Sequence, residues 1–285
     1  MRPEIIFDDI LRNKVSRITA SPYFIKRLAE FCISENKNTH TVKKIFTGGA
    51  PVFPSEAKIF VKAFPKTLVE IVYGSTEAEP ISHIFANELV KEKIEKALPV
   101  GKIYFNAEVK IIKISDLPLT ANNTNDFQEL VLPAGRVGEI IVSGDHVLKK
   151  YFDNEEAFRQ NKIVCGSKTW HRTGDSGFIG EDGNLFLTGR SATLFEHKGK
   201  TVFPFIAEDL LKQIEGVQAG TVMKVKNEVI YFIETSNGNE SKNIEDAIKT
   251  LGIADGKVVF TKIPRDLRHF SKIDYGMLLK QYNKI

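Results

Sequence analysis

The apolar positions of the first hundred residues alternate between two spacings. Apolar residues three and four positions apart predict helices over 4–13, 22–34 and 54–63. Short runs of β-branched and other apolar residues predict strands at VSRIT (15–19), VKKIF (42–46) and LVEIVY (68–73). Strands that alternate with helices indicate βαβ units, so we expect an α/β domain built on a parallel sheet.

The pattern changes near residue 100, where glycines separate short runs of apolar residues. Three such runs are GKIYFNAEVKIIKI (101–114), GEIIVSG (138–144) and GNLFLTG (183–189). They are typical of antiparallel strands, and we expect them to form a β-barrel-like subdomain. The polar residues 116–130 between the first two runs predict a mobile loop.

A third pattern begins after Gly189 and Arg190. Helices and strands are predicted over 204–214, 220–234 (two strands), 242–251, 257–263 and 275–283. Their order is that of a small α+β domain. We therefore expect two domains, 1–189 and 190–285, with the boundary at the glycine and arginine.

Composition excludes several classes of protein. The chain has 285 residues and a formal net charge of +4, and its acidic and basic residues are interspersed, which argues against a nucleic-acid-binding surface. Cys32 and Cys165 are the only cysteines and lack metal-ligand spacing, which indicates a reduced, cytoplasmic protein. No apolar run approaches the roughly 20 residues of a membrane span, and we expect no signal peptide.

The first candidate site lies where the third predicted strand ends, in YGSTE (73–77). The carboxyl ends of strands are where open α/β sheets bind ligands. A nucleotide would use the ring of Tyr73, the hydroxyl of Thr76 for a phosphate oxygen, and Glu77 for Mg²⁺. A plain turn explains the glycine but not the whole set. The upstream GGAP (48–51) either lets the backbone approach a flat ligand or only turns the chain into the next helix.

Later segments supply further candidates. Asp175 lies in a Thr-Gly-Asp turn, where its carboxylate can accept from two ribose hydroxyls or close an Asx-turn. Arg190, at the predicted boundary, is either an ion-pair residue or a ligand contact. A basic cluster before the last helix is either a solvated feature or suited to an anionic ligand; its members are Arg265, Arg268, His269 and Lys272.

Taken in order, these motifs resemble the adenylate-forming superfamily of acyl-CoA synthetases, luciferases and nonribosomal-peptide adenylation domains. The motifs are GGAP (48–51), YGSTE (73–77), GEIIVSGDHVLKKYF (138–152), WHRTGDSG (170–177), GR (189–190) and PRDLRHFSK (264–272). The resemblance covers essentially the whole chain but only the later part of a family member. The last motif is most similar to fatty-acyl-CoA ligases and related members, including olefin β-lactone synthetases.

The resemblance implies a role for each candidate. The implied nucleotide-binding residues are Gly49, Ala50, Pro51, Tyr73, Gly74, Thr76, Asp175 and Arg190. Among them, Tyr73 would stack on adenine, and Asp175 with Arg190 would bind the ribose. The implied catalytic residues are Thr76 at the α-phosphate, Glu77 as the Mg²⁺ ligand, and Lys272 as a bridge between the acyl carboxylate and the phosphate.

The implied activity is that of an acid–thiol ligase. ATP would adenylate a fatty or other acyl carboxylate, and the acyl group would then pass to the thiol of CoA or of a carrier protein's phosphopantetheine. A carboxylate must approach a negatively charged phosphate, so compensating charge and alignment are what such a site supplies. ATP or AMP, Mg²⁺ and CoA are the expected cofactors.

One motif of the family has no counterpart here. Nothing before residue 48 resembles the phosphate loop, a Ser/Thr/Gly-rich stretch that ends in Pro-Lys-Gly. We therefore expect 1–189 to be the later part of the AMP-binding large domain and 190–285 to be a mobile lid. The alternative is a non-catalytic truncated or split-gene module that binds a nucleotide or a partner subunit. The expected partners are the acyl carboxylate, a carrier protein, the missing N-terminal half, and a second copy at an exposed sheet edge.

Overall fold

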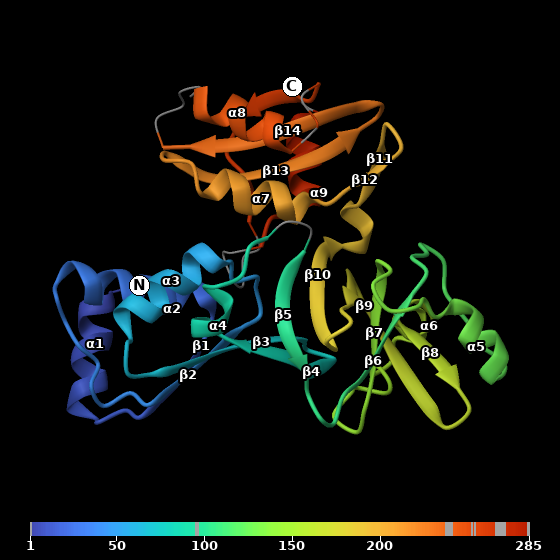
Figure 1. Cartoon of the computed structure of the whole chain (residues 1–285). Helices are drawn as coiled ribbons and strands as arrows, with labels where there is room; N and C mark the ends of the chain where they lie inside the picture. The colour runs from blue at the N-terminus through green and yellow to red at the C-terminus, as the bar shows by residue number, and fades with distance from the viewer. Residues whose placement is uncertain are drawn as a thin grey trace. The chain divides into compact units, whose positions relative to one another are not determined.

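The computed structural model describes residues 2–94, 97–236, 242–251, 253, 255–265 and 272–283. The chain divides into two compact units (Figure 1). The first comprises Met1–Lys93 and Leu98–Leu187, and the second comprises Ile94–Ala97 and Thr188–Ile285. Each unit has its own sheet and its own core, and each is described separately.

The first unit is built on a mixed sheet of ten strands in the order β1-β2-β3-β4-β5-β10-β9-β7-β6, with β8 paired to β9. The strands are β1 (Arg17–Ala20), β2 (Lys44–Gly48), β3 (Leu68–Ser75), β4 (Ala78–Phe85), β5 (Leu98–Ile103), β6 (Glu108–Ile112), β7 (Gly138–Ser143), β8 (Lys162–Cys165), β9 (Lys168–Ile179) and β10 (Asn184–Arg190). Strands β1, β2 and β3 are parallel, and β4 then pairs antiparallel with β3. The predicted α/β class is confirmed.

The strands after β4 extend this sheet, and the described strands close no barrel, so the barrel-like part of the prediction is wrong. The reason is the antiparallel ladder between β5 and β10, in which Leu98 lies opposite Leu187. That ladder attaches the later strands to the earlier ones in a single open sheet. Strands β1 and β6 stand at its two ends.

Three helices lie together beside β1–β3, as Figure 1 shows: α1 (Pro3–Arg12), α2 (Pro22–Ser34) and α3 (Pro54–Ala63). Helix α2 begins where the sequence predicts, because the Ser21 hydroxyl accepts from the backbone N–H of Phe24 at 3.4 Å. Ile25 and Leu28 of this helix are fully buried, as are Ile45 and Phe60. Burial of these side chains attaches the helices to the parallel part of the sheet.

The polar segment 116–130 contains helix α5 (Thr124–Leu130), where the sequence predicted a mobile loop. The side chain of Asn123 accepts from the backbone N–H groups of Asn125 and Asp126 at 2.8 and 3.0 Å, which caps the helix. Phe127 is 4% exposed and stacks on Trp170 with ring centroids 5.1 Å apart. One cap and one buried ring therefore order a segment that composition alone assigns to a loop. The other helices of this unit are α4 (Ala86–Leu89) and α6 (Glu155–Asn161).

The second unit is a small α+β domain around a three-stranded sheet, β13 (Val217–Val225), β14 (Glu228–Thr235) and β15 (Lys257–Phe260). The preceding elements are a single 3-10 turn, η1 (Ser191–Thr193), and a hairpin of β11 (Phe195–His197) and β12 (Lys200–Val202). The helices are α7 (Pro204–Lys212), α8 (Lys242–Thr250) and α9 (Tyr275–Tyr282). Alternate residues of β14 face two cores: Tyr231 packs with Leu211 of α7, and Phe232 packs with Leu278 of α9.

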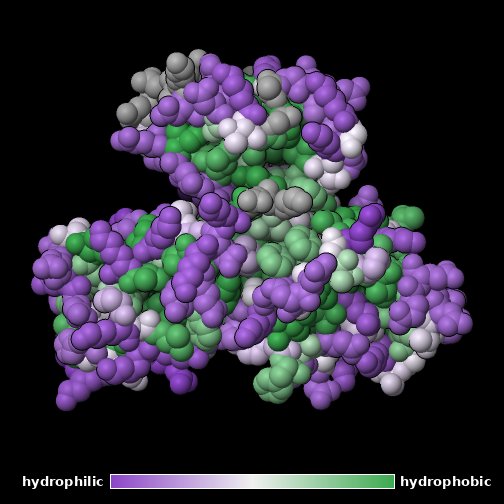
Figure 2. All heavy atoms as spheres, in the orientation of Figure 1, coloured by the Kyte–Doolittle hydropathy of each residue, from purple (hydrophilic) through white to green (hydrophobic). Residues whose placement is uncertain are grey.

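Hydrophilic residues are spread over the face of both units that Figure 2 shows. Among the described residues, no helix is both long enough and apolar enough to cross a membrane.

Candidate functional site

The GGAP turn lies at the carboxyl end of β2, beside β3. Gly48 and Val72 are neighbours in the parallel register, and a Cβ on Gly48 would lie 2.4 Å from the carbonyl oxygen of Val72. Gly49 has a φ of 82°, a value that favours glycine. The glycine pair is therefore needed for the strand approach and the turn. Gly49, Ala50 and Pro51 therefore lie at the same end of the sheet as Tyr73, which follows Val72 along β3.

Two predicted nucleotide-binding residues meet in the first unit. The hydroxyl of Tyr73, on β3, donates to Oδ2 of Asp175, on β9, at 2.9 Å. These residues are far apart in sequence, and β3 and β9 are not neighbouring strands. The contact joins the YGSTE and TGD motifs and positions an aromatic ring beside a carboxylate.

The segment of β9 that carries Asp175 is held by hydrogen bonds to nearby residues. The backbone N–H of Asp175 donates to the hydroxyl oxygen of Thr173 at 3.0 Å, and that hydroxyl donates to the carbonyl oxygen of Ile140 at 2.8 Å. The backbone N–H of Gly174 donates to Oε1 of Glu139 at 3.3 Å, and Gly174 has a φ of 68°. The predicted Asx-turn between two strands is therefore wrong, because Asp175 lies inside β9, where the pairing with β7 shifts register and hydrogen bonds to β7 fix the backbone.

A buried ion pair joins β9 to β7. Nε and Nη2 of Arg172 donate to Oε2 of Glu139 at 3.0 and 2.6 Å, and the two residues are 5% and 3% exposed. Nη1 of Arg172 also donates to the carbonyl oxygens of Leu117 and Gln160, at 2.9 and 3.2 Å. The guanidinium thus joins the segment before α5, the end of α6 and β7 to the strand of Asp175.

Glu77 lies in the turn between β3 and β4, and the loop of residues 147–151 contacts it at two points. The backbone N–H of Leu148 donates to the carbonyl oxygen of Glu77 at 2.7 Å. The hydroxyl of Tyr151 donates to Oε1 of Glu77 at 3.3 Å. Nε2 of His171 lies 3.9 Å from Oε2 of the same carboxylate.

Burial and hydrogen bonds together set the charge states of Glu77, His171 and Lys162. Burial raises the pKa of Glu77, but its own backbone N–H, His171 and Tyr151 outweigh burial and lower that pKa below its usual range. Burial, followed by the charge of Lys162, lowers the pKa of His171 to about 4, so its imidazole is neutral at pH 7. Burial also lowers the pKa of Lys162 to about 8, against the opposing effect of Glu77. At pH 7, where His171 is neutral, hydrogen bonds from the backbone and from Tyr151 therefore keep Glu77 ionised.

The remaining candidates are not all in one unit. Thr76 is exposed in the turn beside Glu77. Arg190 is the last residue of β10 and lies past Thr188, where the second unit begins, and Lys272 precedes α9. Both therefore belong to the second unit, and both are exposed. Arg265 of the predicted basic cluster pairs with Glu234 at 2.9 Å. Arg268 and His269 lie outside the described residues.

Several residues of the candidate site were not identified from the sequence. The motif segments 138–152 and 170–177 contain Glu139, Tyr151, His171 and Arg172, but neither resemblance nor spacing assigned them a role. Lys162 lies in neither motif, and a lysine before an apolar pair is ordinary for a surface strand. Only the fold brings them to Asp175 and Glu77.

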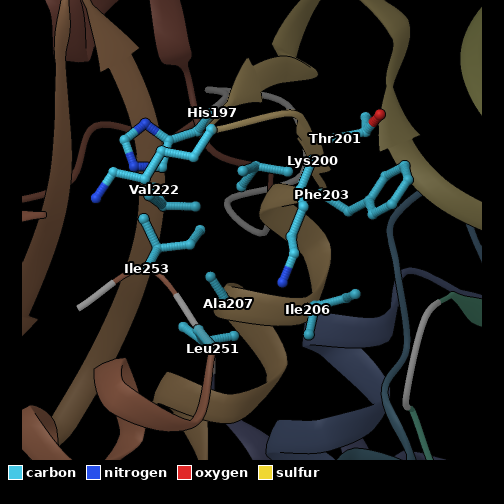
Figure 3. Close-up of a pocket in the computed structure, with 11 residues that line it drawn as sticks. His197, Lys200, Thr201, Phe203, Ile206, Ala207, Val222, Leu251 and Ile253 are labelled. Carbon is cyan, nitrogen blue, oxygen red and sulfur yellow. The ribbon is translucent and has the colours of Figure 1, made fainter. Parts of the chain in front are cut away.

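The second unit contains a hollow of about 240 Å³ between the β11–β12 hairpin and helix α7 (Figure 3). Its apolar lining consists of Val202, Phe203, Ile206, Ala207, Val222, Leu251 and Ile253. At the rim, Nε2 of His197 and Nζ of Lys198 contact Asp255 at 3.1 and 2.8 Å. Figure 3 shows the ammonium group of Lys200 directed over the apolar lining. This arrangement suits an apolar arm that carries a negative charge at one end.

Within the described part of the chain, no three His, Cys, Asp or Glu side chains are grouped as a metal site would require. A cation near Glu77 would therefore take fewer than three such ligands from the described residues. Mg²⁺ is commonly bound in that way, through one or two carboxylates with water and substrate phosphates as its other ligands.

Comparison with known proteins identifies what the chain is similar to. The family model described as AMP-binding enzyme matches residues 1–152, which is more than half of the chain. 4-Coumarate–CoA ligase 2 of Nicotiana tabacum is 29% identical over 263 residues, which cover 90% of this chain and 45% of that protein. 4-Coumarate–CoA ligase 1 of Glycine max is 28% identical over 89% of this chain and 82% of that protein. The chain thus spans about half the length of the first of these relatives.

Solved structures show the same fold. The amide bond synthetase McbA from Marinactinospora thermotolerans matches with a TM-score of 0.79 and 22% identity, over 99% of this chain and 55% of that one. O-succinylbenzoate coenzyme A synthetase (MenE) from Bacillus subtilis, in complex with AMP, matches with a TM-score of 0.76 and 21% identity, over 98% and 53%.

Proposed function

Because the chain belongs to the AMP-binding enzyme family, we propose that it is the portion of an acid–thiol ligase that binds AMP and carries the mobile catalytic lysine. The reaction is ATP-dependent adenylation of an acyl carboxylate, followed by thioester formation. The observation that carries the proposal is the hydrogen bond between Tyr73 and Asp175, at 2.9 Å, which unites two motifs of the proposed nucleotide site.

Each proposed nucleotide contact has a physical basis. The carboxylate of Asp175 is of the type that binds ribose hydroxyls, because a carboxylate only accepts hydrogen bonds and offers about four lone-pair positions. The Tyr73 hydroxyl donates to its Oδ2 and helps to orient it. The ring of Tyr73 provides a flat face for adenine, and Gly49 and Gly74 keep the neighbouring backbone free of side chains. Thr76 is exposed and supplies a hydroxyl for the α-phosphate. Arg190 adds a cation at the start of the second unit.

Glu77 is the proposed Mg²⁺ ligand, and its surroundings fit that role. Its side chain is 27% exposed, its pKa lies below the usual range, and Tyr151 orients one of its oxygens. When bound, Mg²⁺ would neutralise phosphate charge. Glu77 holds a negative charge at a fixed place, and Tyr151 limits the rotation of the carboxylate.

Lys272 is the proposed catalytic cation. A lysine ammonium acts as a compact point charge on a flexible stem, so it can align a carboxylate with a phosphate and then withdraw. Its position in the second unit supports the proposal that 190–285 is a mobile lid and 1–189 the later part of the AMP-binding domain. The hollow beside α7 is our candidate for the arm of the acceptor thiol, CoA or phosphopantetheine, because its lining is apolar and its rim basic.

We also propose that this chain alone binds AMP but does not adenylate. The contacts to β- and γ-phosphates would come from a further polypeptide segment, since such loops work through backbone N–H groups at helix N-termini. Strand β1 at the sheet edge and the rings of Phe105 and Phe152, which are 98% and 99% exposed, support a partner on this unit. The free Cys32 and Cys165 support a cytoplasmic location.

The test is AMP binding to the 285-residue chain, measured by calorimetry for the wild type and two variants. We expect Asp175→Asn to weaken AMP binding about tenfold or more, because a hydrogen bond to a charged group contributes about 1.5–3 kcal/mol. Asp182→Asn is the matched control, because Asp182 is exposed in the turn between β9 and β10 and should leave binding unchanged. Equal AMP affinity in all three proteins would refute the assignment of Asp175.

A second measurement separates the ligase from the non-catalytic module, which remains the alternative because the chain covers 45% of its tobacco relative. Pyrophosphate release is assayed with a panel of fatty and aromatic acids, for the chain alone and with a polypeptide that supplies the phosphate loop. The ligase proposal expects release only with both parts, and loss of release in Lys272→Ala. No release under either condition would favour the binding module.

A further inference from the structure

Lys162, the first residue of β8, is a buried lysine without a carboxylate in contact. It is 3% exposed, and it makes no ion pair with any described carboxylate. Its Nζ donates to the carbonyl oxygen of Leu148 and lies 5.3 Å from the ring centroid of Tyr151. Burying an ammonium group that is not ion-paired costs several kcal/mol, so an apolar residue would serve the fold better at this position.

The two residues that Lys162 contacts, Leu148 and Tyr151, also contact Glu77, each through a different group. The peptide N–H of Leu148 donates to the main chain of Glu77 at 2.7 Å, and the hydroxyl of Tyr151 donates to the carboxylate at 3.3 Å. The loop 147–151 therefore lies between Lys162 on one side and Glu77 on the other. A change at Lys162 reaches Glu77 through both Leu148 and Tyr151.

His171 cannot fulfil this function in place of Lys162. Its Nδ1 lies 3.3 Å from the carbonyl oxygen of Asn161, which can only accept, so Nδ1 carries the proton. In the neutral imidazole Nε2 is then a bare acceptor, and it lies 3.9 Å from Oε2 of Glu77 without donating to it. His171 and Lys162 are direct partners in the β8–β9 ladder, so both face the same region.

We infer that Lys162 is a positioning residue for Glu77: it fixes the loop 147–151 and, through Leu148 and Tyr151, holds the carboxylate in one orientation. The inference rests on the proposed function insofar as Glu77 is taken as the cation ligand at the phosphate. The hydrogen bonds themselves do not depend on that role. Lys162 thus acts on Glu77 through Leu148 and Tyr151 and not by direct contact.

The test compares NMR signals of three variants of the 285-residue chain with those of the wild type. Lys162→Met removes the charge and the donor but keeps an unbranched apolar stem, and Tyr151→Phe removes only one hydroxyl. Lys168→Met is the control, because Lys168 lies on the same hairpin but its side chain is 56% exposed and pairs with Glu108. The readouts are hydrogen exchange of the Leu148 amide and the chemical shift of the Glu77 carboxyl carbon.

Each variant has its own expected pattern. In Lys162→Met the Leu148 amide should exchange at least tenfold faster, and the Glu77 carboxyl signal should shift. In Tyr151→Phe the Glu77 signal should shift while Leu148 keeps its exchange rate, and Lys168→Met should change neither. A purely structural role for Lys162 would instead accelerate exchange throughout β8 and β9. That result, or unchanged Leu148 and Glu77 signals in Lys162→Met, would overturn the inference.

Two wild-type measurements complete the design. If Lys162→Met does not fold, the wild type must still show a slowly exchanging ammonium signal for Lys162 with a nuclear Overhauser contact to the Tyr151 ring, and its absence overturns the inference. Mn²⁺, added with AMP, should broaden the Glu77 signal if Glu77 binds the cation. If Mn²⁺ broadens the Glu77 signal but Lys162→Met changes neither Leu148 exchange nor the Glu77 shift, the positioning role of Lys162 is refuted and the metal role of Glu77 stands. If Lys162→Met gives both changes but Mn²⁺ causes no broadening, only the metal role of Glu77 is refuted.

Discussion

Replacing Arg172 by methionine should be among the most damaging single substitutions in the first unit. The guanidinium is 5% exposed, and it donates to Glu139, which is 3% exposed, at 3.0 and 2.6 Å. Methionine keeps much of the apolar stem but removes the charge and all the donors. Glu139 would then remain buried without its cation, and the carbonyl groups of Leu117 and Gln160 would lose a donor.

The size of the effect follows from this burial. Breaking a buried ion pair by removing one partner costs about 3–5 kcal/mol, because the remaining charge stays desolvated. A domain is typically stable by about 5–15 kcal/mol, so Arg172→Met should remove about a fifth or more of the free energy of unfolding of the first unit. A double variant, Arg172→Met with Glu139→Met, should recover part of the loss, because no buried charge is then unpaired.

Urea unfolding followed by tryptophan fluorescence measures this loss. Trp170 is the only tryptophan of the chain, is 2% exposed and lies two positions before Arg172, so its emission reports on the first unit. Arg27→Met is the control: Arg27 pairs with Glu30 at 3.4 Å, but these side chains are 47% and 39% exposed. Such a surface pair contributes less than about 1 kcal/mol. A loss in Arg172→Met no larger than in Arg27→Met would refute the reasoning.

Two further predictions concern the same unit. Because the pKa of His171 is lowered from 6.5 to about 4, the unfolded chain binds more protons between these pH values, and stability is lost as the pH falls. Between pH 7 and 5, His171→Leu should therefore lose on the order of 2 kcal/mol less of its free energy of unfolding than the wild type. Urea titrations of both proteins at several pH values measure this difference, and an equal loss in the two would contradict the prediction. Phe127→Ala should destabilise the unit by about 3 kcal/mol and expose Trp170, seen as a red shift of its emission, whereas Phe152→Ala should leave both unchanged because that ring is 99% exposed. An unshifted Trp170 emission in Phe127→Ala would show that the stack does not shield the indole.

Local pattern was sufficient for most of the elements. Helix α3 covers Pro54–Ala63, as predicted, because its apolar spacing, proline start and neighbouring strands agree. Helix α5 was missed because its order depends on a long-range stack between Phe127 and Trp170, which composition cannot show. The open sheet was missed because the β5–β10 ladder is a non-local pairing with no local signal.

The candidate site likewise contains residues that a local motif indicates and residues that only the fold brings to it. Tyr73, Glu77 and Asp175 could be proposed from the sequence because each lies in a contiguous motif. Lys162 was not found, because its contacts with Leu148 and Tyr151 come from the return of the chain in β8 after α6. The proposed role of Lys162 depends on the burial of its side chain, and a single lysine in a sequence does not indicate whether it is buried.

The ladder between β5 and β10 also has a consequence for synthesis on the ribosome. Residues 104–183 separate these two strands, so one edge of β5 stays without its final partner while that whole stretch is translated. At about 5–20 residues per second, the delay is on the order of ten seconds. During that interval β5 presents unpaired backbone groups that other chains can reach. Yield in a cell should therefore depend on chaperone supply and on the rate of translation between β5 and β10, even for variants whose finished fold is unchanged.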